Sequence, residues 1–178
     1  MILEIGCGEN PITQDTPDVE TKNVDYRMDV VGFDCVDVCG ITTRLPFCGG
    51  SLSGIVCQHV LEHHSHCSFG DNPTYGSLLK FLIEVHRVLV PGGFFESICP
   101  NFAFIAGLYT EQGRYNLESA ITLMQWAMGG QRDKWDHHGV LLDFNILRHW
   151  AEMAGFERNN IDLLHPFDWF GLHVKIIK

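Results

Sequence analysis

The chain has 178 residues, of which 46% are hydrophobic and 19% are charged, and these values are typical of one folded domain spanning residues 1–178. Its 22 acidic and 12 basic residues give a formal net charge of −10. Because proteins attract nucleic acids and anionic membranes through positive charge, we expect neither as a partner.

The first third of the chain shows three short runs that are typical of strands. They cover residues 2–5, 23–26 and 33–38, and glycines follow the first of them directly. A fourth run, at residues 54–58, is apolar from Ile55 to Cys57. Strands without polar alternation are typical of a parallel sheet that is covered on both faces.

The clearest predicted helix lies in the middle of the chain. Leu78, Leu82, Val85 and Leu89 recur at spacings of four, three and four residues, which places them on one face of a helix. The sequence Pro91-Gly92-Gly93 then ends the helix, and residues 94–99 form a fifth strand.

The last third of the chain predicts two helices and two strands. The helices cover residues 117–128 and 143–154, and glycines follow both of them. Residues 156–164 and 172–177 are expected to form an antiparallel pair of strands. The whole order predicts an α/β fold, namely a Rossmann-like doubly wound sheet of about seven strands in a three-layer α/β/α arrangement, mostly parallel with an antiparallel terminal strand.

The cellular setting is predicted from what the sequence contains. The seven cysteines are odd in number and include no Cys-x-x-Cys pair, which favours reduced thiols over disulfides. No apolar run reaches the about 20 residues that cross a bilayer, and the segment from Met1 to Glu4 does not resemble a signal peptide. We therefore expect a cytoplasmic protein.

Residues suited to a nucleotide-like ligand follow the first two strands. Gly6-Cys7-Gly8 comes directly after residues 2–5, where a missing Cβ lets a ligand approach the backbone. Asn10-Pro11 is typical of a helix start, which binds anions. Asp25, at the predicted end of the second strand, can accept hydrogen bonds from a ribose diol. A tight turn followed by a surface aspartate explains the same residues without a ligand.

Six motifs in order resemble class I S-adenosylmethionine-dependent methyltransferases, in particular the type 11 group, and the resemblance covers residues 2 to 177. They are ILEIGCG at 2–8, Val24-Asp25, VDV at 36–38 leading to LPF at 45–47, IVCQHVLEH at 55–63, EVHRVLVPGG at 84–93, and AGF at 154–156. Each motif is short, so their common order carries the resemblance.

The resemblance implies a methyltransferase that uses S-adenosylmethionine. Gly6, Cys7 and Gly8 would face its methionine part, and Glu4 would help to orient the ammonium group. Asp25 would hold the ribose, and Tyr26 would lie along the adenine. Asp37 and Val38 would bind the adenine amine. Gln58 and His59 would line the space near the reactive sulfonium.

The chain departs from this family in two respects. It begins at the first strand, without the helices that usually precede it, which raises the alternative of a truncated gene. The stretch between Gly8 and Asp25 also lacks the periodicity of a crossover helix. Both departures predict an open cofactor site unless a second subunit of a homodimer, or residues 101–142, covers it.

Histidine is the residue type best suited to act as a general base near pH 7. His59 is the first candidate, because it leaves the fourth strand at the ligand edge, and His137 and His138 are the second. All three also fit a structural histidine. The cluster of His59, His63, His64, His66 and Cys67 contains metal-binding residue types, but no second pair with suitable spacing exists, so we expect no metal.

Residues 101–142 contain aromatic side chains and are expected to shape the pocket of a small-molecule acceptor, although aromatic residues are equally common in cores. Two other functions fit the same pattern. A nicotinamide-dependent dehydrogenase is disfavoured by the missing third glycine, and a protein that binds S-adenosylmethionine without catalysis is the second alternative.

Overall fold

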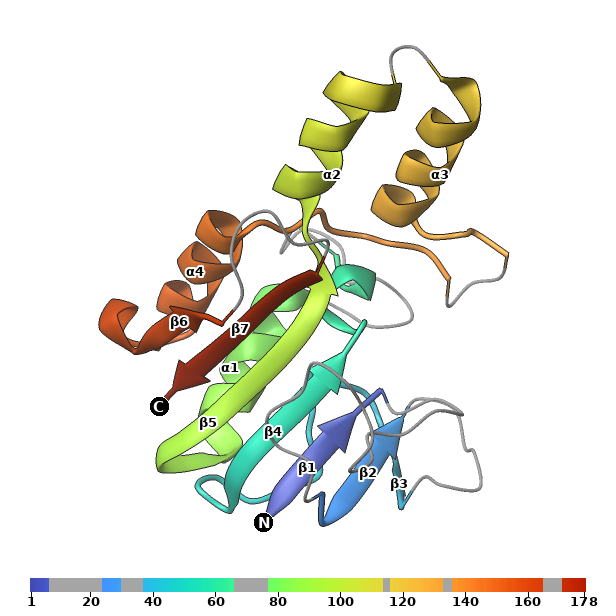
Figure 1. The fold of residues 1–178 in the computed structure, drawn as a ribbon. Helices are drawn as coiled ribbons and strands as arrows, with labels where there is room; N and C mark the ends of the chain where they lie inside the picture. The colour runs from blue at the N-terminus through green and yellow to red at the C-terminus, as the bar shows by residue number, and fades with distance from the viewer. Residues whose placement is uncertain (7–23, 30–36, 66–76, 114–115, 133–135, 165–170) are drawn as a thin grey trace.

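The computed structural model describes residues 1–6, 24–29, 37–65, 77–113, 116–132, 136–164 and 171–178. Figure 1 shows a twisted sheet with helices packed along it and further helices above its end. The strands are β1 (Ile2–Ile5), β2 (Tyr26–Asp29), β3 (Val38–Cys39), β4 (Leu52–Gln58), β5 (Leu89–Pro100), β6 (Ile161–Leu163) and β7 (Gly171–Ile177). The helices are α1 (Leu78–Val88), α2 (Phe102–Leu108), α3 (Leu117–Met128) and α4 (Phe144–Met153), with short helical turns η1 (Leu61–His63), η2 (Tyr109–Gly113) and η3 (Arg158–Asn160).

The strands within the described ranges all belong to one sheet with the order β3-β2-β1-β4-β5-β7-β6. Six of them have three or more residues, and β3 has only two. The first five strands pair in parallel, whereas β7 is antiparallel to both of its neighbours, β5 and β6. The strand order reverses between β1 and β4. The predicted α/β fold, with a mostly parallel sheet and an antiparallel last strand, is confirmed.

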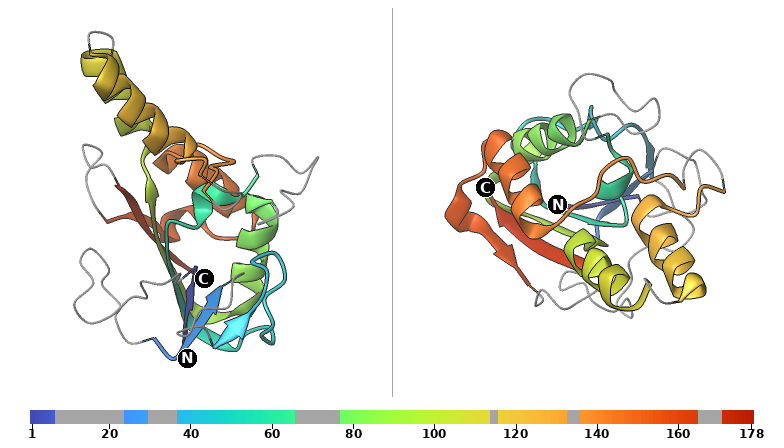
Figure 2. Two further views of the ribbon diagram at one scale, coloured as in Figure 1. Left: turned by 90° about the vertical axis from the view of Figure 1, so that its right-hand side faces the viewer. Right: turned by 90° about the horizontal axis from the view of Figure 1, so that it is seen from above.

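The main core lies between one face of the sheet and the helices α1 and α4, which the views in Figure 2 place on the same side. Alternation along the strands puts Leu3, Ile55 and Phe95 on this face, where they pack with Phe81 of α1 and Leu147 of α4. The described residues therefore form two layers. Residues 7–23 and 30–36 lie outside the described ranges, so the predicted third layer remains a prediction.

The opposite face of the sheet carries polar as well as apolar side chains. Val56 and Ile98 form a small apolar cluster there. Beside it, the buried His173 contacts the buried Glu96, with 2.9 Å between Nε2 and Oε1. No helix within the described ranges is long and apolar enough to cross a membrane.

Predicted element bounds are confirmed where apolar periodicity is strong. β1, α1 and α3 lie at or within one residue of the predicted ranges, and α4 begins after Asp143, whose carboxylate accepts from the backbone N–H of Ile146. The predicted stop at Pro91-Gly92-Gly93 is wrong. β5 continues through it, because a shift in register against β4 absorbs these residues.

Two residues of the EVHRVLVPGG motif hold the LPF motif in place. Arg87 donates to both carboxylate oxygens of Glu84 at 2.7 and 2.8 Å, and to the carbonyls of Phe47 and Leu45 at 2.9 and 3.0 Å. Glu84 in turn accepts from the backbone N–H of Leu45 at 2.9 Å. These motifs thus have a structural role, in which α1 anchors the segment that leads into β4.

Glu84→Gln is expected to lower the free energy of unfolding by about 1–2 kcal/mol at pH 7, because a charge-assisted, partly exposed network is weakened. The hydrogen bond from Arg87 lowers the pKa of Glu84 below its ordinary value of 4.5. Because the pKa of Glu84 is lower in the folded protein, the ionised carboxylate stabilises the fold at pH values above its unfolded pKa. This contribution disappears as the pH falls through the folded pKa.

Denaturant unfolding at several pH values checks this prediction. The stabilities of the wild type and Glu84→Gln should converge below pH 4.5. Glu152→Gln is the matched control, because its ion pair with Arg158 lies on the surface, and little change is expected from it. A Glu84→Gln variant as stable as the wild type at pH 7 contradicts the structural role.

Candidate functional site

A close approach of two chain segments marks the carboxyl ends of β1 and β4. Gly6 follows β1 with φ +72°, and its N–H donates to the carbonyl of Met28 at 2.8 Å. A Cβ built at Gly6 would lie 2.2 Å from Cγ2 of Val60, just beyond β4. Only glycine fits here, since both the backbone angle and the space exclude a side chain. The position lies where the strand order reverses, which is the ligand-binding edge of such sheets.

The turn after β4 presents two further predicted residues at this edge. Gln58 is the last residue of the strand, and the N–H of His59 donates to the carbonyl of Ile98 at 2.8 Å. His59 has a left-handed backbone with φ +54°, a conformation that costs a non-glycine residue about 1–3 kcal/mol. Its side chain is 57% exposed. Gly6, Gln58 and His59 thus lie at one edge of the sheet, and their contact with a cofactor stays a prediction.

Glu62, which we did not single out as a functional residue from the sequence, is a deeply buried acidic group of this edge. Its side chain is 3% exposed, and Oε1 lies 3.2 Å from Nδ1 of His59. The other oxygen, Oε2, is buried with no hydrogen-bond partner among the described residues. The hydrogen bond from His59 raises the pKa of that histidine above its ordinary value, while burial opposes the change.

The segment before α4 packs against η1 and brings a distant histidine to the same place. The backbone N–H groups of Gly139 and Val140 donate to the carbonyl of Glu62 at 2.7 and 3.2 Å. The rings of His63 and His138 meet edge to face, with centroids 5.1 Å apart. Burial lowers the pKa of His138 below its ordinary value, which favours the neutral imidazole.

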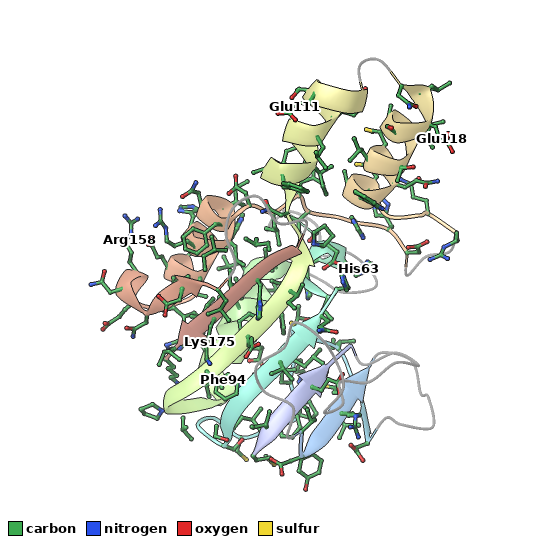
Figure 3. The ribbon with its side chains drawn as sticks, in the orientation of Figure 1. His63, Phe94, Glu111, Glu118, Arg158 and Lys175 are labelled. Atoms are coloured by element: carbon green, nitrogen blue, oxygen red, sulfur yellow. The ribbon has the colours of Figure 1, made fainter. Side chains whose placement is uncertain are left out.

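A small cavity opens beside these groups, between the end of β5, α2 and the segment before α4. Glu62 and His138 supply its polar lining, and the rest is apolar: Pro100, Phe102, Ile105, Ala127, Val140, Leu141 and Leu142. Figure 3 shows His63 at the same end of the sheet, beneath α3. The geometry thus combines one carboxylate and two imidazoles with an apolar wall.

Three predicted cofactor residues lie elsewhere, because β2 begins where we expected it to end. Asp25 precedes the strand, and its Oδ2 accepts from the N–H of Ile2 at 2.7 Å, at the amino end of the sheet. Tyr26 pairs with Leu3 and is exposed. Asp37 precedes β3 and accepts from the N–H of Arg27 at 2.8 Å. The predicted positions of these residues at the ligand edge are therefore wrong.

The residue that ends β2 is Asp29, paired with Cys39 of β3. Val38 pairs with Met28 one step earlier. Glu4 lies within β1, is 2% exposed, and contacts Nε of Arg27 at 3.2 Å. Asp29 was missed because β2 has almost no apolar residues to mark its bounds. The sequence does offer a second acidic residue four positions after Asp25, and this residue could have been considered as the end of the strand.

Some predicted residues cannot be placed. Cys7 and Gly8, and also His66 and Cys67, lie outside the described residues. His64 is buried beneath the edge, where its Nε2 lies 2.8 Å from the hydroxyl of Thr42 and its ring stacks on Phe81. Burial lowers the pKa of His64 to about 4, so His64 is a neutral structural histidine.

The predicted insertion, residues 101–142, includes α2, η2 and α3, which stand above the carboxyl end of the sheet (Figure 1). Phe102 faces the small cavity, whereas Tyr109 and Trp126 are each 40% exposed. The outer side of α3 exposes Leu117, Ile121 and Met124, and an open groove of about 460 Å³ runs along it. This segment therefore supplies both a cavity wall and an exposed apolar surface.

No family model and no curated protein matches the sequence. Solved methyltransferases match the structure. CalH, a trans-methyltransferase in complex with SAH (S-adenosylhomocysteine), is 17% identical with a TM-score of 0.54, and the match covers 99% of this chain and 50% of CalH.

Two further methyltransferase structures match over a larger share of their own length. The S-adenosylmethionine-dependent methyltransferase from Thermotoga maritima is 13% identical with a TM-score of 0.56, over 99% of this chain and 81% of that one. The enzyme from Mesorhizobium loti is 11% identical with a TM-score of 0.54, over 99% and 90%. At these identities the likeness is one of fold. The chain has the fold of class I S-adenosylmethionine-dependent methyltransferases.

Proposed function

We propose that this chain, which has the class I methyltransferase fold, transfers a methyl group from S-adenosylmethionine to a small-molecule acceptor. The observation that carries the proposal is Gly6, a left-handed residue directly after β1 whose missing Cβ leaves room only for backbone beside Val60. Gly6 lies at the carboxyl edge where the strand order reverses, and ligands of such sheets bind at that edge. The antiparallel β7 between β5 and β6 departs from the dinucleotide-binding order 3-2-1-4-5-6, which speaks against a dehydrogenase.

The residues at the carboxyl edge fit this cofactor. Gly6, with Cys7 and Gly8 after it, would face the methionine part, and Glu4 would act on the ammonium group through the backbone or water. Gln58 and His59 would line the space near the sulfonium. For the ribose we propose Asp29 in place of Asp25, because Asp29 ends β2 at this edge. Val38 would lie near the adenine.

The cofactor supplies, when bound, a methyl group on a positively charged sulfur. Methyl transfer requires an acceptor held in line with that methyl group, so positioning supplies much of the rate. A base is needed only where the acceptor carries a proton at its nucleophilic atom. His59, exposed at the edge and held by Glu62 at 3.2 Å, would accept that proton at Nε2.

The acceptor would bind between the carboxyl edge and the segment 101–142, whose apolar lining suits an apolar or aromatic molecule. A second copy of the chain is the macromolecular partner that we propose, with the exposed apolar side of α3 as its contact. The net charge of −10 supports the absence of a nucleic acid partner. A location in the cytoplasm stays a prediction from the sequence.

A protein that binds S-adenosylmethionine without catalysis is the second candidate. The observation in its favour is that Asp25, Tyr26 and Asp37 lie away from the edge, so fewer side chains hold the ligand than the family pattern implies. An open site of this kind gives weaker binding, because water competes for exposed polar contacts.

Binding and turnover are measured separately to decide between the two candidates. We expect calorimetry to show binding of S-adenosylmethionine with a Kd in the micromolar range, about −8 kcal/mol, and a matching rise in Tm. Methyl transfer from labelled cofactor to a panel of small acceptors tests the activity. Binding with no transfer to any acceptor supports the non-catalytic candidate, and no binding at millimolar cofactor contradicts both.

A further inference from the structure

We propose that Glu62, His63 and His138 bind a divalent transition metal ion, with zinc as the first candidate. Each residue offers one ligand atom, and the three atoms lie within 4.8 Å of one another. Glu62 and His63 come from η1 directly after β4, and His138 comes from the segment before α4. The site lies at the carboxyl edge of the sheet but uses different side chains from those proposed to hold the cofactor.

The buried oxygen of Glu62 is the first independent indication of a ligand. The side chain is 3% exposed, and Oε2 has no hydrogen-bond partner among the described residues. A buried carboxylate oxygen without a partner is costly, because it loses its water and gains nothing in return. A cation at this position removes that cost. Oε1 is already held by Nδ1 of His59 at 3.2 Å, so the orientation of the carboxylate is fixed.

The two histidines are oriented as metal ligands usually are. Nδ1 of His63 lies 3.0 Å from the carbonyl of His137, and Nδ1 of His138 lies 3.1 Å from the carbonyl of Ala127. A carbonyl only accepts, so each Nδ1 carries the proton and each Nε2 carries the lone pair. This arrangement, in which the second ring nitrogen donates to a backbone carbonyl, is the common support of a metal-bound imidazole.

Backbone hydrogen bonds hold the two segments together without any metal. Gly139 and Val140 both donate to the carbonyl of Glu62, and the N–H of His138 donates to the carbonyl of Met128 at 3.1 Å. Gly139 cannot carry a side chain here, since its Cβ would lie 2.4 Å from the carbonyl oxygen of His64. The ligands are thus brought together in advance, which reduces the cost of ordering them on binding.

Two imidazoles and one carboxylate form a ligand set that zinc accepts with a fourth position left open. Zinc bonds of about 2.0–2.1 Å place tetrahedral ligands about 3.3 Å apart, so modest side-chain rotations close the site. Glu62 and His138 also line the small cavity, and the open position would face it. There the ion could bind water or an oxygen atom of an acceptor. Only the binding of an acceptor depends on the proposed methyltransferase function.

The test measures metal binding by the intact, untagged chain in the absence of cofactor and acceptor, so its outcome is independent of the proposed function. After dialysis against a chelator, zinc is titrated by calorimetry, and cobalt is added separately to record its visible spectrum. We expect one equivalent of zinc to bind with a Kd at or below about 1 μM, a rise in Tm, and a cobalt spectrum typical of four-coordinate nitrogen and oxygen ligation.

Conservative variants assign the binding to these residues. Glu62→Gln and His138→Gln should each weaken zinc binding at least about tenfold, while circular dichroism shows an unchanged fold. His149→Gln is the control, because this exposed histidine lies on α4, and it should bind zinc as the wild type does. Absence of zinc binding at 100-fold excess, or undiminished binding in both Gln variants, overturns the proposal.

Discussion

Gly6→Ala is expected to lower the free energy of unfolding by about 2–4 kcal/mol and to abolish measurable binding of S-adenosylmethionine. A left-handed backbone costs alanine about 1–2 kcal/mol, and overpacking of a filled site costs about 1–3 kcal/mol. The new methyl group would lie 2.2 Å from Cγ2 of Val60, so the turn after β1, where we propose that the cofactor binds, must shift. Denaturant unfolding and calorimetry measure the two effects.

Gly50→Ala separates the cost of the left-handed backbone from the cost of the contact with Val60. Gly50 has a similar left-handed backbone, with φ +63°, but a Cβ there meets no atom within 4 Å. We expect this control to lose about 1 kcal/mol of stability and to bind the cofactor normally. Replacing Val60 by Ala in the Gly6→Ala background should restore part of the lost stability, because the clashing methyl group is removed. Equal effects of Gly6→Ala and Gly50→Ala would show that the contact with Val60 is not tight.

Asp29→Ala is expected to weaken S-adenosylmethionine binding about 10- to 100-fold, because a carboxylate that accepts from a ribose diol contributes about 1.5–3 kcal/mol. Asp29 ends β2 at the same edge as Gly6. Calorimetry with the purified variants measures the change in Kd.

Asp25→Ala is the matched control, four residues earlier. Its carboxylate accepts from the N–H of Ile2 at the amino end of the sheet, so we expect an affinity close to that of the wild type and a modest loss of stability. The reverse result would be a loss of affinity in Asp25→Ala and an unchanged affinity in Asp29→Ala. It would contradict the placement of β2 and indicate that Asp25 binds the ribose.

Apolar periodicity explains which parts of the fold could be predicted from the sequence. The heptad-like spacing of Leu78, Leu82 and Val85 identified α1, because these side chains face the core. The run Ile55-Val56-Cys57 identified β4, because it is buried on both faces of the sheet. β2 offers no such pattern. Met28 packs in the core, whereas Tyr26 is exposed, so an acidic residue preceded by valine, Asp25, was mistaken for the end of the strand.

The candidate site could be predicted only where its residues are close in sequence. Gly6 follows a strand directly, and His59 leaves another, so both were predicted at the ligand edge. His138 lies far along the chain from Glu62 and reaches it through backbone hydrogen bonds of Gly139 and Val140. No spacing in the sequence encodes that contact, which is why the histidine-rich stretch alone predicted no metal site.

The helices α2 and α3 share an apolar cluster that is separate from the core beneath the sheet. Ile105, Leu123 and Ala127 are its buried members, with Leu108, Met128 and Leu141 packed around them. A unit whose apolar contacts are mostly internal can open with a lower free energy than the whole domain. The amide protons of α3 would then exchange with solvent through local openings, whereas those of β4 would exchange only through global unfolding. The unit of α2 and α3 can thus open locally while the sheet stays folded. A ligand bound beneath these helices could then dissociate without any unfolding of the sheet.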